Sequence, residues 1–277
     1  MQITSRDNSL LRQARNVRDG KVDELIFVEG LRLCVEAVRS QLEIEAAIFS
    51  EQLLQKERIA ATIAEISQAS RRVASVSEKL LESISFTKTP QGIVVLARRP
   101  QASRERLAAN LTANPLLVVL HQINNPVNVG AILRTAEAAG ATGIVTTQKT
   151  SDPFSPKSLR GAMGSAFRLP VWRNASFADV VEWCRAKRIR LVGTAADASL
   201  KHTDWDWNSA CALVLGPEST GLLEEELKNM DQTISIPMHG AVESLNVSVA
   251  AGVLLYEAAR QRSIETPRSR SSPSCKS

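Results

Sequence analysis

The sequence has 277 residues, of which 44% are hydrophobic and 23% are charged. This apolar content is enough for one large or two modest cores, and two domains fit the length better. No apolar run approaches the roughly 18 residues that a membrane helix needs, and residues 1–10 lack the apolar segment of a secretory signal. We therefore expect a cytoplasmic protein that does not associate with a membrane.

The charge balance and the cysteines narrow the function classes only slightly. A net charge of +5 and a pI near 9.2 are compatible with a polyanionic partner, but many ordinary proteins are this basic. The cysteines contain no Cys-x-x-C pair, so we expect neither a zinc site nor a disulfide framework, and no metal. They are Cys34, Cys184, Cys211 and Cys275.

Residues 1–98 are predicted to form a small α/β domain. A basic helix carries Arg12, Arg15 and Arg18 at three-residue spacing, which places them on one broad face. Apolar periodicity then predicts strands at 25–28, 46–49 and 92–97, a helix over 31–38, and helical structure within 52–69. The following segment, 99–114, is basic and polar, and we interpret it as an interdomain linker.

Residues 115–263 alternate between predicted strands and helices, which is typical of a parallel sheet. Strands are expected at 116–120, 143–146, near 171, and at 190–194, 212–215 and 233–236. Helices are expected at 128–139, 159–167, 177–187, 222–230 and 244–260. The remaining residues, 264–277, are rich in Ser, Arg and Pro, so we expect a disordered basic tail.

In an open parallel sheet, ligands bind beyond the carboxyl ends of the strands, and three of the loops there have unusual sequences. The first, 124–130, leads into a helix on which Asn128 could be the cap, and Arg134 follows six residues later. We expect these two side chains to point into one pocket. Seen alone, Asn128 could be only a helix cap, and Arg134 could equally be a surface charge.

The second and third loops contribute further polar groups. The second, 216–221, has a glycine at each end but lacks the Lys-Ser/Thr pair of a nucleotide-binding P-loop. The third, 236–248, runs from a strand end into the last helix. Taken one at a time, these residues could be caps, turns or surface charges. Together they place two amides, an arginine, a carboxylate and a hydroxyl at one sheet edge.

At this point the sequence resembles the SpoU or TrmH-type RNA ribose methyltransferases of the SPOUT class. Three stretches are similar to the family's motifs in the right order: NPVNVGAILRTA (125–136), LVLGPESTGL (213–222) and ISIPMHGAVESLNVSVAAGVLLYE (234–257). Residues 155–171 resemble the intermediate region, and Phe27-Val28-Glu29-Gly30 resembles part of the RNA-binding substrate domain. Asn125 stands where the family often has Asp before the proline.

The resemblance implies a C-terminal domain with a deep trefoil knot, an exception to the usual absence of knots. It implies S-adenosylmethionine as the methyl donor, held by backbone around Thr194, Gly216, Ile236 and Leu245, with Met238 nearby. The implied catalytic cluster is Asn128, Arg134, Glu218, Ser244 and Asn246. It also implies a homodimer whose partner subunit completes the site.

These residue types suit methyl transfer to a ribose 2′-hydroxyl, in which the hydroxyl must be oriented and lose a proton. Arginine stays protonated in proteins, so we expect Arg134 to orient the ribose and phosphate and to stabilise the developing alkoxide. We expect Ser244 and Asn246 to position the hydroxyl or the donor's carboxylate. Glu218 would orient Arg134 or Asn128.

The RNA-binding surface and the RNA itself are less constrained by the sequence. Arg12 and Arg15, with Arg6 and Arg18, could follow RNA phosphates or form a solvated helix surface, and Lys157 and Arg160 are a second candidate pair. The three histidines are interpreted as hydrogen-bonding loop residues. An N-terminal domain of this size, together with the intermediate segment, resembles the ribosomal RNA enzymes of the family more than its transfer RNA enzymes.

Two other function classes compete with this interpretation. A non-catalytic RNA-binding protein of the same fold would be expected to lose part of the cluster, whereas Asn128, Arg134 and Asn246 are all present. A dinucleotide-dependent oxidoreductase would need G-x-G-x-x-G after a strand, followed by an acidic residue about 20 positions on. The sequence has no such pattern.

Overall fold

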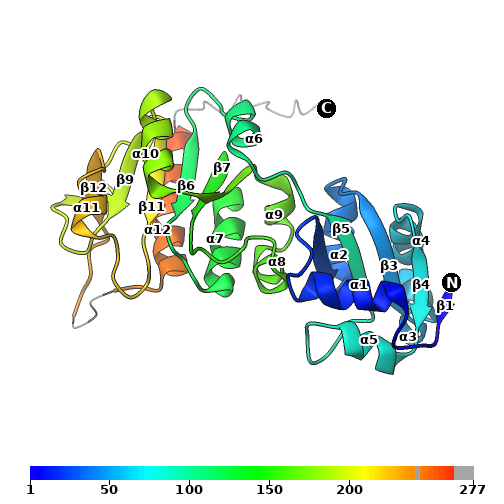
Figure 1. The fold of residues 1–277 in the computed structure, drawn as a ribbon. Coiled ribbons are helices and arrows are strands. Elements are labelled where there is room, and N and C mark those ends of the chain that lie inside the picture. Colours follow the sequence, from blue (N-terminus) through cyan, green and yellow to red (C-terminus); the bar gives the residue numbers. More distant parts are fainter. Residues whose placement is uncertain (241, 243, 265–277) are drawn as a thin grey trace, which may run out of the picture.

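The computed structural model describes residues 1–240, 242 and 244–264. Of the tail predicted over 264–277, Ile264 is the last residue of a helix, and 265–277 lie outside the described residues. The described chain forms two sheets, one of five strands in the order β1-β4-β3-β5-β2 and one of seven strands in the order β10-β12-β9-β11-β6-β7-β8. Figure 1 shows the two sheets side by side, each with its own helices. Among the described residues, no helix is both long and apolar enough to cross a membrane.

The N-terminal sheet combines parallel and antiparallel pairs. Strands β1, β4 and β3 run parallel, whereas β5 is antiparallel to both β3 and β2. The predicted strands and the helix over 31–38 are confirmed. The elements are β1 (Gln2–Ile3), α1 (Ser9–Arg18), β2 (Leu25–Glu29), α2 (Leu31–Arg39), β3 (Ile44–Ser50), α3 (Glu51–Leu54), η1 (Glu57–Ile59), α4 (Ala60–Gln68), β4 (Val73–Val76), α5 (Glu78–Ile84) and β5 (Ile93–Arg98).

The C-terminal sheet is entirely parallel across its seven strands. Parallel pairing with helices on both faces explains the continuous apolar runs of its strands. The elements are α6 (Arg104–Ala109), β6 (Leu116–Leu120), α7 (Pro126–Ala138), β7 (Gly143–Thr147), α8 (Pro156–Ala162), α9 (Ser165–Arg168), β8 (Val171–Ala175), α10 (Phe177–Ala186), β9 (Arg190–Thr194), β10 (Leu200–Lys201), β11 (Cys211–Leu215), α11 (Glu224–Leu227), β12 (Gln232–Ser235) and α12 (Val247–Ile264).

The structure differs from the sequence-based expectation in several local features, including α11, which spans only Glu224–Leu227 where a helix over 222–230 was expected. The segment 99–114 contains α6, whose Leu107 is fully buried directly over Gly143 of the C-terminal sheet. The helix expected over 159–167 is two helices, because Met163 and Gly164 have φ angles of 50° and 96°. The last helix begins at Val247, and Asn246 accepts a hydrogen bond from the Ser248 amide ahead of its first turn.

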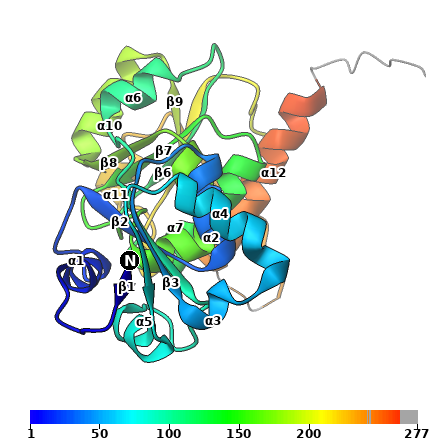
Figure 2. The same ribbon diagram turned by 90° about the vertical axis from the view of Figure 1, so that its right-hand side faces the viewer.

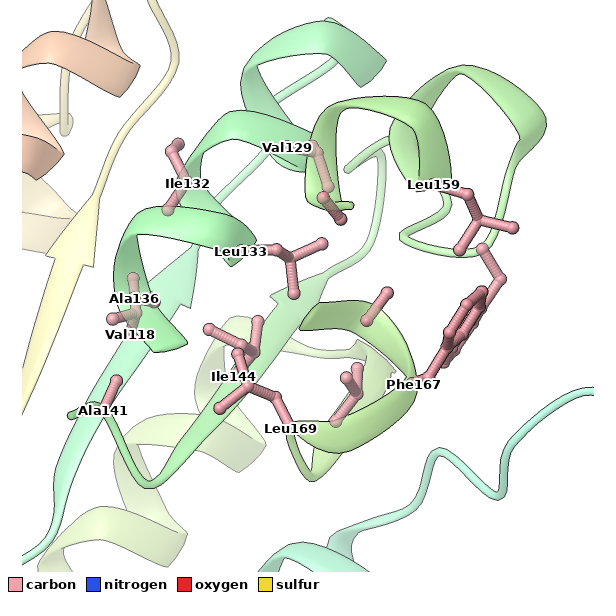
Figure 3. Packing of buried hydrophobic residues seen from close by; sticks show 14 of the residues in the cluster. Val118, Val129, Ile132, Leu133, Ala136, Ala141, Ile144, Leu159, Phe167 and Leu169 are labelled. Atoms are coloured by element: carbon pink, nitrogen blue, oxygen red, sulfur yellow. The ribbon is translucent and has the colours of Figure 1, made fainter. Parts of the chain in front are cut away.

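The core of the C-terminal domain fixes the start of α7, which carries the first motif. Val129, Ile132 and Leu133 are fully buried against neighbours from the sheet and from α8 and α9 (Figure 3). Gly130 of α7 and Gly161 of α8 lie face to face, and a side-chain carbon on Gly130 would collide with the Ser158 carbonyl oxygen. The two helices can therefore cross in close contact only because both positions are glycine.

Ion pairs join the two domains. Arg168 of α9 contacts Glu36 of α2 at 2.6 Å and also Glu137 of α7, while Asp23 contacts Arg173 at 2.9 Å. Hydrogen bonds from Arg168 and Arg173 hold the pKa values of Glu137 and Asp23, respectively, below their ordinary values. Residues of α2 and α7 consequently line a common groove between the domains.

Candidate active site

The expected cofactor residues come together at the carboxyl ends of three neighbouring strands. In the parallel register, Thr194 of β9 pairs with Ile234 of β12, and Gly193 pairs with Val214 of β11. Gly216 lies two residues beyond Val214, and Ile236 lies two residues beyond Ile234. Thr194, Gly216 and Ile236 therefore lie side by side at one edge of the sheet, as expected.

The loop after β11 is tightly closed. A side-chain carbon on Gly216 would lie 2.7 Å from the Gly221 carbonyl carbon and 2.8 Å from the Leu222 nitrogen, so only glycine fits there. Gly221 has a φ of 63°, and its amide donates to the Pro217 carbonyl at 2.9 Å. Glu218 is thereby held at the outside of a compact turn.

Three of the predicted catalytic residues form one hydrogen-bonded cluster. Asn128, which is 5% exposed, donates its side-chain amide to the Glu218 carboxylate. Its carbonyl oxygen accepts from the Asn246 amide at 3.4 Å. Each residue comes from a different segment, so the cluster joins the start of α7 to the two loops that follow β11 and β12.

Ser248 joins this cluster, although the sequence reasoning did not assign it a role. Its hydroxyl donates to the Asn246 side-chain oxygen at 2.6 Å. The signal was its position two residues after Asn246, where the backbone amide closes an Asx turn on the Asn246 side chain and brings the hydroxyl close to it. Ser244, Leu245 and Met238 lie on the same loop, with Ser244 exposed and Met238 half-buried.

Asn128 does not cap α7, although its position in the sequence allowed that role. Asn125 is the cap, since its side chain accepts from the Val127 amide at 3.0 Å and Pro126 starts the helix. The asparagine that replaces the family's frequent aspartate therefore keeps a capping role. Asn128 is left free to face Glu218.

Arg134 does not share the pocket of Asn128 within one chain. Six residues along an α-helix rotate the side chain by about 600°, which leaves the two residues about 120° apart. Arg134 is exposed and lines a groove of about 910 Å³ between α7 and the N-terminal domain, together with Arg32 and Glu36 of α2. No hydrogen bond within the described residues connects it to Glu218.

A buried histidine supports the loop after β11. His121, directly after β6, contacts the Glu226 carboxylate at 2.7 Å through Nε2 and the Thr147 hydroxyl at 3.0 Å through Nδ1. The second oxygen of Glu226 accepts from the Leu223 amide at 2.8 Å. His121 is thus a hydrogen-bonding residue, as predicted, and its contacts fix the far side of the glycine loop.

The chemical groups that line this edge of the sheet fit S-adenosylmethionine better than a metal or a polyphosphate. It offers strand-end backbone groups, the uncharged amides of Asn128 and Asn246, and the apolar side chains of Ile236, Met238 and Leu245. Such groups suit a neutral adenine ring and an amino-acid moiety. Within the described part of the chain, no group of three or more His, Cys, Asp or Glu side chains is arranged to hold a metal ion.

The predicted RNA-binding residues differ in their solvent exposure and in their contacts within the protein. Arg12, Lys157 and Arg160 are exposed. Arg15 donates to the Arg6 carbonyl at 3.0 Å, and Arg18 contacts Asp19 at 2.8 Å. The expected basic face of α1 is therefore partly engaged in contacts within the protein.

Two family models match the chain, one for each domain. The SpoU rRNA Methylase family matches residues 115–256, and an MRM3-like substrate binding domain matches residues 10–95. The first of these covers just over half of the chain. The chain belongs to the SpoU rRNA methylase family.

Individual relatives agree with this assignment. A 23S rRNA (guanosine-2′-O-)-methyltransferase RlmB of Vibrio vulnificus is 31% identical, over 82% of this chain and 95% of its own length. A 23S rRNA (uridine(2479)-2′-O)-methyltransferase of Streptomyces viridochromogenes is 34% identical, over 69% of this chain and 68% of its own. The crystal structure of the SpoU methyltransferase AviRb from the latter organism, in complex with AdoMet, superposes with a TM-score of 0.82 at 28% identity, covering 92% of this chain and 98% of that one.

Proposed function

We propose that this protein transfers a methyl group from S-adenosylmethionine to a ribose 2′-hydroxyl of ribosomal RNA. The observation that carries the proposal is the Glu218–Asn128–Asn246 cluster at the strand ends that line the expected donor site. The similar proteins named above are 23S rRNA 2′-O-methyltransferases, which favours ribosomal over transfer RNA. One acts on guanosine and the other on uridine, so the target base is left open. A ribosomal RNA substrate agrees with the cytoplasmic location expected from the sequence.

The methyl donor would be held at Thr194, Gly216, Ile236 and Leu245, with Met238 beside it. When bound, it supplies an electrophilic methyl group on a sulfonium. The protein's part is to align the ribose hydroxyl with that methyl group and to keep water away, because an in-line displacement depends on alignment. The closed turn at Gly216 and its support by His121 and Glu226 make this edge rigid.

Within the cluster, each hydrogen bond fixes the orientation of the next side chain. Glu218 accepts from the Asn128 amide, which turns the Asn128 carbonyl oxygen toward Asn246. Asn246 and Ser244 would then position the hydroxyl or the donor's carboxylate. This arrangement favours Glu218 as the residue that orients Asn128, one of the two roles expected for it.

We propose that Arg134 acts in the partner subunit's site of a homodimer. Arg134 points away from the cluster of its own chain, while the next residue, Thr135, packs against Gly252 of α12. On α12, Val249, Val253 and Tyr256 form one stripe with exposed fractions of 52%, 37% and 57%. Figure 2 shows α12 along an outer edge of the molecule, and an apolar stripe of this kind suits a symmetric helix–helix contact.

Charging that stripe tests the dimer. We expect Val253→Glu to turn a dimer into a monomer in multi-angle light scattering and to abolish methyl transfer, while Val73→Glu, an exposed site on the other domain, leaves both unchanged. A wild-type monomer that is fully active would contradict the proposal.

The domain boundaries and the knot are also part of the proposal. We assign residues 1–98 to RNA binding, 99–114 to a connection that includes α6, and 115–263 to methyl transfer, with 264–277 as a tail. We further propose that the chain end forms a trefoil knot. The strand order, in which β11 returns beside β6 with β9 and β12 beyond it, and the packing of α12 on α7 are compatible with that threading.

RNA would contact both domains in this scheme. Arg12, Arg15, Lys157 and Arg160 are the proposed phosphate contacts, with Arg15 limited by its bond to Arg6. The competing function is a non-catalytic RNA-binding protein of the same fold. Incubation with labelled S-adenosylmethionine and unmodified bacterial 23S rRNA separates the two: we expect label in the RNA, and its complete absence despite tight binding would favour the competitor.

A further inference from the structure

A buried carboxylate in the N-terminal domain holds a surface loop in place. Glu29, the last residue of β2, is only 6% exposed. Its two oxygens accept hydrogen bonds from the Phe86 amide at 3.0 Å, the Thr87 amide at 3.2 Å and the Thr87 hydroxyl at 2.6 Å. Burying a charge is costly unless it is fully hydrogen-bonded, so this arrangement fixes the loop between α5 and β5.

The loop that Glu29 holds presents an aromatic ring to solvent. Phe86 is 43% exposed, the most exposed of the chain's six phenylalanines. An isolated exposed apolar residue is ordinary, but here the backbone amide of that residue is itself tied to the buried carboxylate. The ring is therefore presented from a fixed position.

Basic and polar residues stand close to Phe86 and Glu29 in the sequence. Lys88 and Thr89 follow in the same loop and are exposed, and Arg32 is exposed on the first turn of α2, just after Glu29 and Gly30. At the far end of the loop, the Gln91 side chain lies over Gly30. In Figure 1 the loop after α5 lies on the lower side of the molecule, the side toward which the chain leaves β11 and β12.

We propose that Phe86 is a stacking platform for an unpaired base of the RNA substrate, with Lys88 and Arg32 contacting the flanking phosphates. Proteins read single-stranded RNA by stacking splayed bases on aromatic rings beside positive charges. Because Glu29 holds the backbone that carries the ring, that backbone would lose little freedom on binding, which favours affinity. The inference rests on the proposed function, since it names how the N-terminal domain holds the RNA whose ribose is methylated.

The test compares Phe86→Leu, Phe86→Ala, Phe86→Tyr and a control, Leu54→Ala, in the full-length protein. Leu54 is an apolar residue of the same domain with the same exposed fraction, 43%. The readouts are the affinity for unmodified 23S rRNA at fixed salt and the KM and kcat of methyl transfer. Because Phe86 is exposed, the variants are expected to melt at the wild-type temperature.

Stacking predicts that Phe86→Ala and Phe86→Leu weaken RNA binding by about 5- to 100-fold and raise KM, with kcat nearly unchanged. Phe86→Tyr and Leu54→Ala should behave as wild type. Full binding by Phe86→Leu would overturn the stacking role, because leucine keeps the apolar surface but has no ring.

The outcome separates this inference from the proposed function. If the wild type methylates 23S rRNA and the Phe86 variants bind normally, the platform is wrong and the enzyme assignment stands. If the wild type methylates no RNA, the assignment fails, and the affinity of Phe86→Ala relative to Leu54→Ala still decides the platform.

Discussion

The two domains use buried polar side chains at their strand ends in different ways. In the C-terminal domain, Asn128 is buried and its hydrogen bonds lead to Glu218 and Asn246, at the edge where the donor is proposed to bind. In the N-terminal domain, Glu29 is buried and its hydrogen bonds lead only to the backbone and side chain of a surface loop. If the proposed function is correct, the Asn128 cluster aligns reacting groups, whereas the loop held by Glu29 presents a binding surface. Changes in the cluster should then reduce kcat, and changes in the loop should raise KM.

The largest effect is expected at the centre of the cluster. Asn128→Ala removes the only residue that contacts both Glu218 and Asn246 among the described hydrogen bonds, and we expect kcat to fall about 100- to 1000-fold. Asn125→Ala is the matched control: loss of the helix cap should cost about 1 kcal/mol of stability with little change in kcat. Equal losses of kcat in both variants would mean that helix stability, not the cluster, controls turnover.

Arg134 should show the next largest effect. Arg134→Lys keeps the charge but loses the planar fork, and misalignment of the ribose should lower kcat by about 100-fold. Mixed dimers of Arg134→Ala and Asn128→Ala chains should regain partial activity if each site takes Arg134 from the partner. Failure of such mixtures to exceed either parent would place Arg134 in its own chain's site.

The exposed basic pair on α8 should affect binding alone. Lys157→Ala with Arg160→Ala should lower RNA affinity uniformly across sequences and flatten its salt dependence by about one unit per lost phosphate contact. A fall in kcat at saturating RNA, without a change in the salt slope, would show that this pair acts in the active site and not in binding RNA phosphates.

The smallest effect concerns the ion pairs between the domains. The pKa values of Glu137 and Asp23 are lowered by Arg168 and Arg173, so these carboxylates stabilise the native state above their ordinary pKa values of 4.5 and 3.8. That contribution should be lost progressively as the pH falls below these ordinary values and through the lowered native pKa values. Because the pairs are partly exposed, it should stay under about 1 kcal/mol each. Arg168→Ala should therefore flatten the acid limb of the melting-temperature profile.

Much of the C-terminal fold was predictable from the sequence, because parallel strands buried on both faces are continuous apolar runs. The strand at 116–120 was predicted with its exact bounds. In the N-terminal domain β4 was missed, since Val73 is exposed and Ser75 breaks the apolar run. Likewise, α6 was not predicted because its first turn is charged, and Leu107 is its one buried residue that packs on the sheet.

The sequence predicted which residues form the candidate site better than it predicted how they are arranged. The loop motifs brought Asn128, Glu218 and Asn246 together as expected, but Arg134 was misplaced because rotation along the helix separates it from Asn128. The support from His121 and Glu226 depends on residues 105 positions apart. The loop held by Glu29 likewise joins residues 57 positions apart, and no local pattern reveals such contacts.

The most direct test of the central claim is to locate the methyl group on the RNA. Unmodified 23S rRNA is methylated with labelled S-adenosylmethionine, digested to nucleosides, and the product is identified by mass spectrometry and mapped by resistance to alkaline cleavage. The account predicts one labelled 2′-O-methyl ribose, absent with Asn128→Ala and present with Asn125→Ala. Label on a base, or no label on any RNA with wild-type protein, would contradict it.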